Sequence, residues 1–104
     1  MTAILAVDDD PDILTALRRA LTPLGIPLIL TEDPTEVLAI LAEQPIGVLI
    51  SDIDVPQMTG LELMAQVRVA HPEVVRILLT GRTTFDTAMT AINEGEVHRY
   101  LNKP

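Results

Sequence analysis

The stretch "VLISDIDVPQMTG", residues 48–60, decides how the rest of the chain is interpreted. Apolar and small residues lead directly into Asp52, a second acid follows at Asp54, and Pro56 and Gly60 then break the strand pattern. Two carboxylates beside an apolar run repel each other and resist desolvation, so they are costly unless a positive group shares their site. We therefore expect a buried strand that ends in a functional acid, with the compensating charge brought from elsewhere in the chain.

The composition is that of one acidic domain without cysteine. The chain has 104 residues, which predicts a single domain over residues 1–104. A hydrophobic content of 48% excludes a disordered acidic tail despite a formal net charge of -8. Without Cys there are no disulfides, thiolate nucleophiles or zinc–thiolate sites. The acidic balance disfavours direct nucleic-acid binding, and the sequence has neither a signal peptide nor an apolar run of the ~20 residues that a membrane span needs. We expect a soluble, cytoplasmic module.

Short apolar runs recur along the chain and alternate with helical patterns. The apolar runs are "AILAV" (3–7), "IPLIL" (26–30), "IGVLI" (46–50), "VVRILL" (74–79) and "VHRYL" (97–101). The helical patterns cover residues 10–25, 34–41, 60–67 and 85–95. Near-continuous apolar strands that alternate strictly with helices predict an α/β fold with a parallel sheet covered on both faces. No helix follows the last strand, so we expect one covering helix to be absent, because the chain is cut from a longer protein.

Polar residues follow four of the predicted strands. They are Asp8, Asp9, Asp52, Thr80 and Lys103. The carboxyl ends of parallel strands collect ligands at the switch point of an open sheet, so these side chains are expected at one rim. Clustered carboxylates make a hard oxygen site suited to Mg²⁺, and an ammonium and a hydroxyl beside it can hold phosphoryl oxygens. A cation and Lys103 would then offset the charge of Asp52.

The segments "VDDD", "SDIDVPQMTG", "LLTG" and "YLNKP", in this order and spacing, resemble the response-regulator receiver domain of two-component signalling. The resemblance covers the whole chain except a final helix. It implies a doubly wound five-stranded parallel sheet in flavodoxin-like strand order 2-1-3-4-5, with four helices present and the fifth absent. It also implies a signalling phospho-acceptor that assists only its own phosphorylation and dephosphorylation, rather than an enzyme.

The resemblance assigns roles at the predicted rim. Asp52 would be the phospho-acceptor and would share Mg²⁺ with Asp9, a direct ligand, with Asp8, which acts on metal-bound water, and with the backbone carbonyl of Asp54. Thr80 would hydrogen-bond the phosphoryl group. Lys103 would pair with that group, and the Lys103–Pro104 bond would be cis. Tyr100 matches the aromatic residue whose rotamer follows activation.

One departure from the family pattern suggests a tuning pair. Asp54 places a carboxylate where many family members carry a neutral side chain, and it would repel the phosphoryl group. We hypothesise that Arg82 pairs with Asp54 and sets the lifetime of the phosphorylated state. His71 and His98 have no partners at ligand spacing and are predicted to lie at the surface.

The resemblance also implies partners. They are a sensor histidine kinase or phosphotransfer protein, a C-terminal output domain absent from this chain, and a second copy in a homodimer through the face formed by the fourth helix and fifth strand. Two other interpretations stay open. "LISDIDV" also resembles the nucleophile motif of haloacid-dehalogenase-type phosphatases, although there the acidic pair comes last in the chain. The other interpretation is an interaction module that keeps the fold without phosphorylation.

Overall fold

The computed structural model describes residues 2–52, 54–55, 58–80 and 98–102. The long strands are β1 (Ala3–Val7), β2 (Leu28–Thr31), β3 (Ile46–Asp52), β6 (Val75–Thr80) and β7 (Arg99–Asn102), and the helices are α1 (Pro11–Leu21), α2 (Val37–Glu43) and α3 (Gly60–Ala70). Short 3₁₀ turns cover Thr22–Leu24 and Pro34–Glu36. In the part of the chain described here, no helix is long and apolar enough to cross a membrane.

The strands form one parallel sheet in the order β2-β1-β3-β6-β7. This confirms the predicted order 2-1-3-4 for the first four predicted strands, and β7 lies parallel to β6 beyond them. The helix predicted over residues 85–95 lies outside the described residues. A feature that the sequence did not predict is the antiparallel pairing of β4 (Asp54–Val55) with β5 (Met58–Thr59) just after β3.

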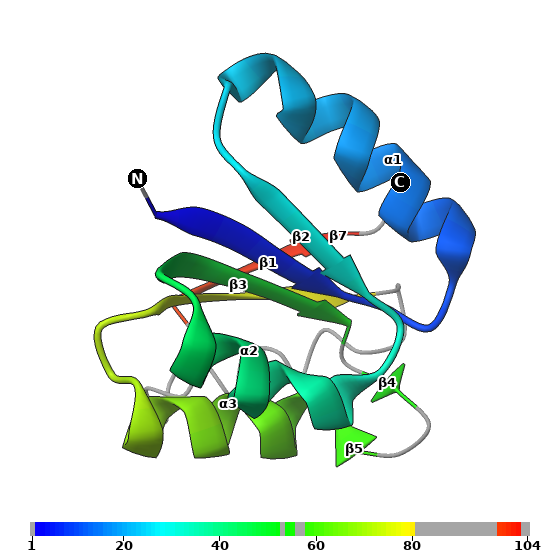
Figure 1. Cartoon of the computed structure of the whole chain (residues 1–104). Helices are drawn as coiled ribbons and strands as arrows, with labels where there is room; N and C mark the ends of the chain where they lie inside the picture. The colour runs from blue at the N-terminus through cyan, green and yellow to red at the C-terminus, as the bar shows by residue number, and fades with distance from the viewer. Residues whose placement is uncertain (1, 53, 56–57, 81–97, 103–104) are drawn as a thin grey trace.

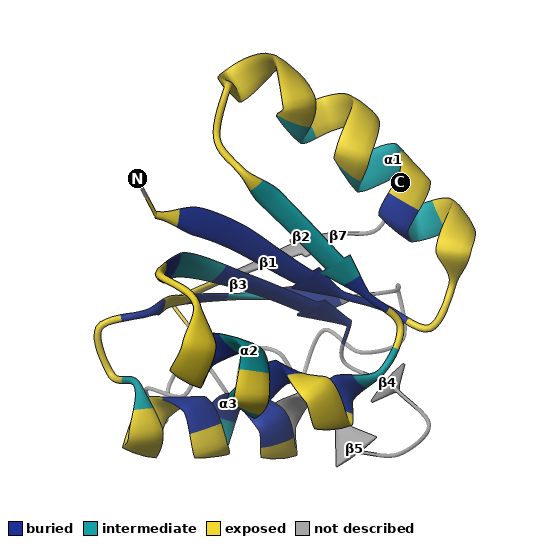
Figure 2. Ribbon diagram, viewed as in Figure 1, coloured by how far each residue is buried: buried dark blue, intermediate teal, exposed yellow. Residues whose placement is uncertain are grey.

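Helices cover both faces of the sheet, so the predicted layer arrangement is confirmed for the described elements. α1 lies on one face, and α2 and α3 lie on the other (Figure 1). The side chains of β1, β2, β3 and β6 therefore alternate between two cores, and Figure 2 shows β1 and β3 largely buried between the helices. The α2/α3 core contains Leu5, Val7, Leu49, Leu63, Met64, Val67 and Leu78, and the α1 core contains Ile4, Ala6, Leu14, Ile50 and Leu79.

Local signals fix the start and end of α1. The Asp10 side chain accepts a hydrogen bond from the Asp12 amide at 2.9 Å, and Pro11 occupies the first turn, as its fixed φ favours. The helix ends earlier than predicted because Pro23 follows Thr22 and tightens the chain into a 3₁₀ turn. Gly25 then takes φ 71, the left-handed conformation that returns the chain toward β2.

Candidate metal centre

Three carboxylates meet at the carboxyl ends of β1 and β3. The two strands are neighbours in the sheet and Val7 pairs with Ser51, so the acids that follow these positions are brought together. One carboxylate oxygen from each of Asp8, Asp9 and Asp52 lies within 4.8 Å of the others. Asp8 is 0% exposed and Asp52 is 4% exposed, whereas Asp9 is exposed to solvent.

Backbone hydrogen bonds hold Asp8 in place from two sides. Its amide donates to the carbonyl of Thr31 at 3.2 Å, which ties the end of β1 to the end of β2. Its Oδ1 accepts from the Asp10 amide at 2.9 Å, so the same turn that begins α1 also orients this carboxylate. The Asp8 position is therefore set before any ligand arrives.

Buried hydroxyls stabilise the ends of the adjacent strands. Ser51, which is 0% exposed, donates from Oγ to the carbonyl of Asp52 at 2.9 Å. Thr31, which is 9% exposed, donates from Oγ1 to Glu36 Oε2 at 3.1 Å and accepts from the Asp33 amide at 3.1 Å. Neither Ser51 nor Thr31 was predicted from the sequence to belong to the site. The available signal in the sequence was their position at the end of an apolar strand. Ser51 lies one residue before Asp52, and Thr31 lies opposite Asp8.

The chemistry of these donors fits Mg²⁺. Carboxylate oxygens are the hard ligands that this ion takes, and one or two carboxylates usually leave room for water and phosphate oxygens. Like charges this close repel one another, and two of the three carboxylates are buried, so a cation between them would relieve this repulsion. The arrangement is able to hold a divalent cation beside the exposed Asp9, where a phosphorylated group could approach.

The other predicted site residues are placed only in part. Thr80 ends β6 one residue past Leu79, which pairs with Asp52, so its backbone lies at the same edge of the sheet. Asp54 pairs with Thr59 in the short hairpin, and Tyr100 pairs with Leu78 through the backbone of β7. Arg82, Lys103 and the Lys103–Pro104 bond lie outside the described residues, so their predicted roles stay predictions.

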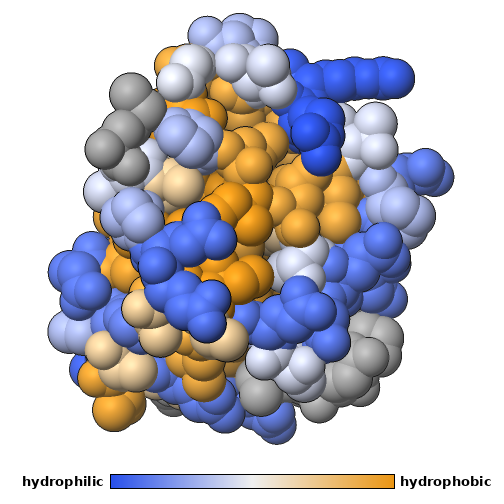
Figure 3. All heavy atoms as spheres, in the orientation of Figure 1, coloured by the Kyte–Doolittle hydropathy of each residue, from blue (hydrophilic) through white to orange (hydrophobic). Residues whose placement is uncertain are grey.

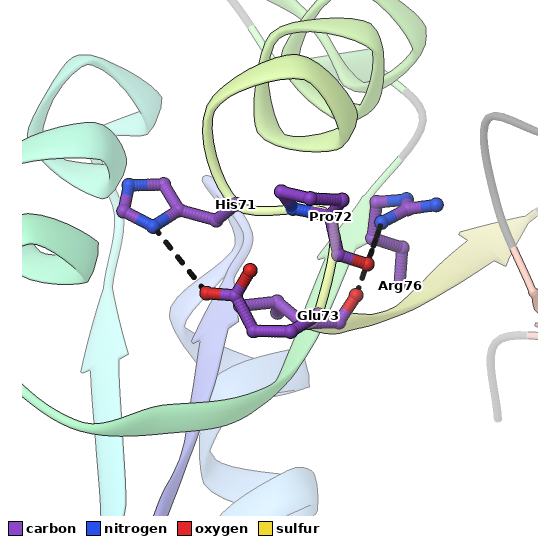
Figure 4. A network of polar contacts seen from close by, with 5 residues as sticks. His71, Pro72, Glu73 and Arg76 are labelled. Atoms are coloured by element: carbon purple, nitrogen blue, oxygen red, sulfur yellow. Dashed lines mark hydrogen bonds and ion pairs between the residues drawn. The ribbon is translucent and has the colours of Figure 1, made fainter.

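A second polar group lies at the opposite, amino end of β6. Arg76 is 5% exposed, and its Nη1 donates to the carbonyls of Val74 at 3.1 Å and Pro72 at 3.4 Å (Figure 4). His71 Nδ1 lies 3.8 Å from Glu73 Oε1 in the same loop (Figure 4). His98 is exposed as predicted, but its Nδ1 also accepts a hydrogen bond from the Arg76 amide at 2.9 Å. A single charge inside "VVRILL" was the sequence signal for this group.

Comparison with known proteins identifies the same family that the sequence resembles. The response regulator receiver domain model matches residues 4–104. The chain is 40% identical over 101 residues to the DNA-binding transcriptional regulator NtrC of Salmonella typhimurium, a match that covers 97% of this chain and 21% of that protein. The chain thus spans about a fifth of the length of this curated relative.

Solved structures share the fold. The signal receiver domain of an HD domain-containing protein from Pseudomonas fluorescens Pf-5 is 40% identical with a TM-score of 0.88, covering 97% of this chain and 74% of that one. The response regulator protein TrrA of Thermotoga maritima, in complex with Mg(2+)-BeF, is 27% identical with a TM-score of 0.85, covering 100% of this chain and 88% of that one. The chain belongs to the response regulator receiver domain family of two-component systems.

Proposed function

We propose that Asp52 is the phospho-acceptor of this receiver domain and takes a phosphoryl group from a phosphohistidine of a sensor kinase or phosphotransfer protein. The observation that carries this proposal is the convergence of the Asp8, Asp9 and Asp52 carboxylates within 4.8 Å in a chain of this family. Asp52 ends β3 at the carboxyl edge of the sheet, beside the exposed Asp9, and this is the side from which a donor would approach.

The transfer is a nucleophilic substitution at phosphorus. A carboxylate oxygen of Asp52 forms a bond to phosphorus as the phosphorus–nitrogen bond of the phosphohistidine breaks, and the electron pair of that bond stays on the imidazole, which then takes a proton. Mg²⁺ held by Asp8, Asp9, Asp52 and the Asp54 carbonyl would neutralise the charge on the transferred group. The hydrogen bonds from the Asp10 amide to Asp8 and from Ser51 to the Asp52 carbonyl keep the two strand ends in position during this step.

Thr80 at the end of β6, together with residues that follow it in the chain, would complete the site. Thr80 would hydrogen-bond the new phosphoryl group and Lys103 would pair with it, since that group carries about -1.5 to -2 charge and three acceptor oxygens. Tyr100 would then change its rotamer and alter the face made by the fourth helix and β7. An Asp54–Arg82 pair would screen repulsion at the phosphoryl group and set its lifetime.

The partners follow from the family. A sensor kinase supplies the phosphoryl group, and we propose that residues 1–104 form a single receiver domain that controls an output domain in a longer regulator. Support comes from NtrC, a DNA-binding transcriptional regulator of which the matched region is 21%. The homodimer through the fourth helix and β7 also remains a proposal, because the fourth helix lies outside the described residues. The family match over residues 4–104 favours this function over the phosphatase alternative.

Mass spectrometry tests the assignment. After incubation with acetyl phosphate and Mg²⁺, the wild-type chain should gain one phosphoryl group that is lost in base, as an acyl phosphate is. Asp52→Asn should gain none, whereas Glu43→Gln, an exposed acid on α2, should react like wild type. A chain that stays unmodified under these conditions would favour the interaction module, whereas an Asp52→Asn variant that is modified equally would place the acceptor at another residue.

A further inference from the structure

β2 presents an open hydrogen-bonding edge. It is the outer strand of the sheet, and no strand within the described ranges pairs with its outer side. The carbonyls of Pro27 and Thr31 accept bonds from Ile4 and Asp8 at 2.9 and 3.2 Å, so these residues point their main-chain groups inward, toward β1. Because successive residues of a strand alternate in this direction, Leu28 and Leu30 point their N–H and C=O groups outward. Pro27 does not interrupt this edge, since its missing N–H belongs to the inner side.

The same edge is apolar on both faces. Leu28, Ile29 and Leu30 are each only half-buried, which is unusual for an edge strand without a charge of its own. The flanking helices add half-buried apolar side chains, which are Ile13, Leu17 and Leu21 from α1 and Leu38 and Ile40 from α2. Figure 3 shows apolar surface across the middle of the molecule, where Figure 1 places β2 beside α1.

The two ends of this edge carry opposite charge. Arg18 and Arg19 are exposed in the last turn of α1, which leads through a short turn to the amino end of β2. Glu32 and Glu36 are exposed just past the carboxyl end of β2. A copy of the chain whose β2 runs in the opposite direction would therefore bring its acidic end to the basic end of the first.

We propose that the β2 edge is an interface between two copies of this chain, in which the two β2 strands pair antiparallel about a two-fold axis at Ile29. In such a pair, side chains that oppose each other lie on the same face of the sheet. A two-fold axis makes the residue through which it passes oppose its own copy, and this residue can be either Ile29 or Leu30. An axis at Leu30 would set Leu28 against the charge of Glu32. With the axis at Ile29, Leu28 of each copy opposes Leu30 of the other, and their outward N–H and C=O groups bond reciprocally.

This interface is distinct from the phospho-acceptor function and from the proposed homodimer through the fourth helix and β7. Neither Asp52 nor any residue of β6 or β7 contributes to it. Asp52→Asn should therefore associate as wild type does, so that a failure of phosphorylation and a failure of association are told apart.

Charge reversal at the two ends tests the orientation by sedimentation equilibrium. Glu32→Arg makes the chain less acidic. The weaker general repulsion between two copies would by itself strengthen their association. The proposed pairing instead predicts a dissociation constant about 3- to 10-fold higher, because the introduced guanidinium would face the arginines of α1 twice per dimer. Adding Arg19→Glu should recover most of that loss. A monomer at every concentration, or a dimer that Glu32→Arg tightens or leaves unchanged, would overturn the proposal.

A cysteine on the axis tests the register, and the chain has no cysteine of its own to interfere. Two copies of Ile29 would form a non-hydrogen-bonded pair with Cα atoms about 4.5 Å apart, within the roughly 4.4–6.8 Å that disulfides span. In dilute protein under mild oxidation, Ile29→Cys should form a covalent dimer much faster than Val69→Cys, whose site on α3 is 84% exposed. Equal rates for the two variants would rule out the axis at Ile29. Circular dichroism confirms that each variant is folded.

Discussion

The carboxylates of Asp8 and Asp52 have oxygens within 4.8 Å of each other at the adjacent ends of β1 and β3, and both residues are buried. Such a pair stores electrostatic repulsion, because burial weakens the screening that water gives to like charges. Sheet packing imposes the proximity: strands that are buried on both sides fix where the two acids emerge. The fold therefore holds the site in a state that a cation stabilises.

Mg²⁺ should accordingly raise the thermal unfolding midpoint of the chain. A ligand that binds only the native state stabilises it by about 2.7 kcal/mol when its concentration is one hundred times its dissociation constant. Asp8→Asn and Asp52→Asn should each lose most of this Mg²⁺-dependent shift, whereas Glu43→Gln on the exposed side of α2 should keep it. Circular dichroism melts with and without Mg²⁺ give the measurement. Equal shifts in all four proteins would mean that the ion binds elsewhere.

The main features of this site could be predicted from the sequence because they depend on position along strands. Near-continuous apolar runs indicate buried parallel strands, and an acid directly after such a run must emerge at the rim, as Asp8 and Asp52 do. The order of the first four strands, which the resemblance to receiver domains implied, is confirmed as well.

What the sequence did not predict depends on contacts between distant segments. The bonds of Thr31 to Glu36 and to the Asp8 amide, and that of Arg76 to His98, exist only once the sheet has assembled. The second strand was predicted over 26–30 but runs from Leu28 to Thr31, because pairing with β1, not apolar character, sets its ends. The β4–β5 hairpin was missed because two-residue strands carry no periodicity.

The turn after β2 contains a carboxyl group whose titration should depend on Thr35. The Thr35 hydroxyl and amide donate to Asp33 Oδ1 at 2.6 and 2.9 Å, and these bonds hold the pKa of Asp33 below its ordinary value of 3.8. A lowered folded-state pKa stabilises the protein above the unfolded value, and this stabilisation is lost as pH falls through the folded value.

Thr35→Val removes the hydroxyl donor but leaves the amide. We expect the pKa of Asp33 to rise toward 3.8, as followed by carboxyl-carbon NMR, and the variant to unfold at lower urea concentration than wild type at neutral pH. The difference should shrink once pH falls below the folded-state pKa. Thr35→Ser, which keeps a hydroxyl, should behave like wild type. A stability difference that persisted unchanged into acid would assign the effect to packing.

Arg76 should stabilise the α3–β6 loop through its guanidinium rather than through its charge alone. Burial is the main cause that lowers its pKa, followed by the nearby charge of Arg68, but the group still stays charged at neutral pH. Arg76→Met should lower the free energy of unfolding by roughly 1–3 kcal/mol, because the Val74 and Pro72 carbonyls lose their donor.

Urea unfolding of Arg76→Lys separates the contribution of the positive charge from that of the hydrogen bonds to the two carbonyls. It keeps the charge but loses the planar group that reaches both carbonyls, so it should fall between wild type and Arg76→Met. Glu43→Gln, at an exposed charged residue in α2, should change stability by less than about 0.5 kcal/mol. If Arg76→Lys were as stable as wild type, the positive charge would be sufficient for stability, and the hydrogen bonds to the carbonyls would contribute little to the free energy of unfolding.

His98 fastens the beginning of β7 to β6 in both directions. Its amide donates to the Arg76 carbonyl at 2.8 Å, and its Nδ1 accepts from the Arg76 amide at 2.9 Å, so the ring carries its proton on Nε2. His98→Ala leaves the Arg76 amide without this acceptor and should cost about 0.5–1.5 kcal/mol of stability. The Oδ1 of Asn can occupy the place of Nδ1, so His98→Asn should recover most of the loss.

Hydrogen exchange at the Arg76 amide reports the bond directly: it should accelerate in the Ala variant and remain slow in the Asn variant. An Arg76 amide that stays equally protected without any side-chain acceptor at position 98 would show that the backbone pairing of β6 and β7 is sufficient.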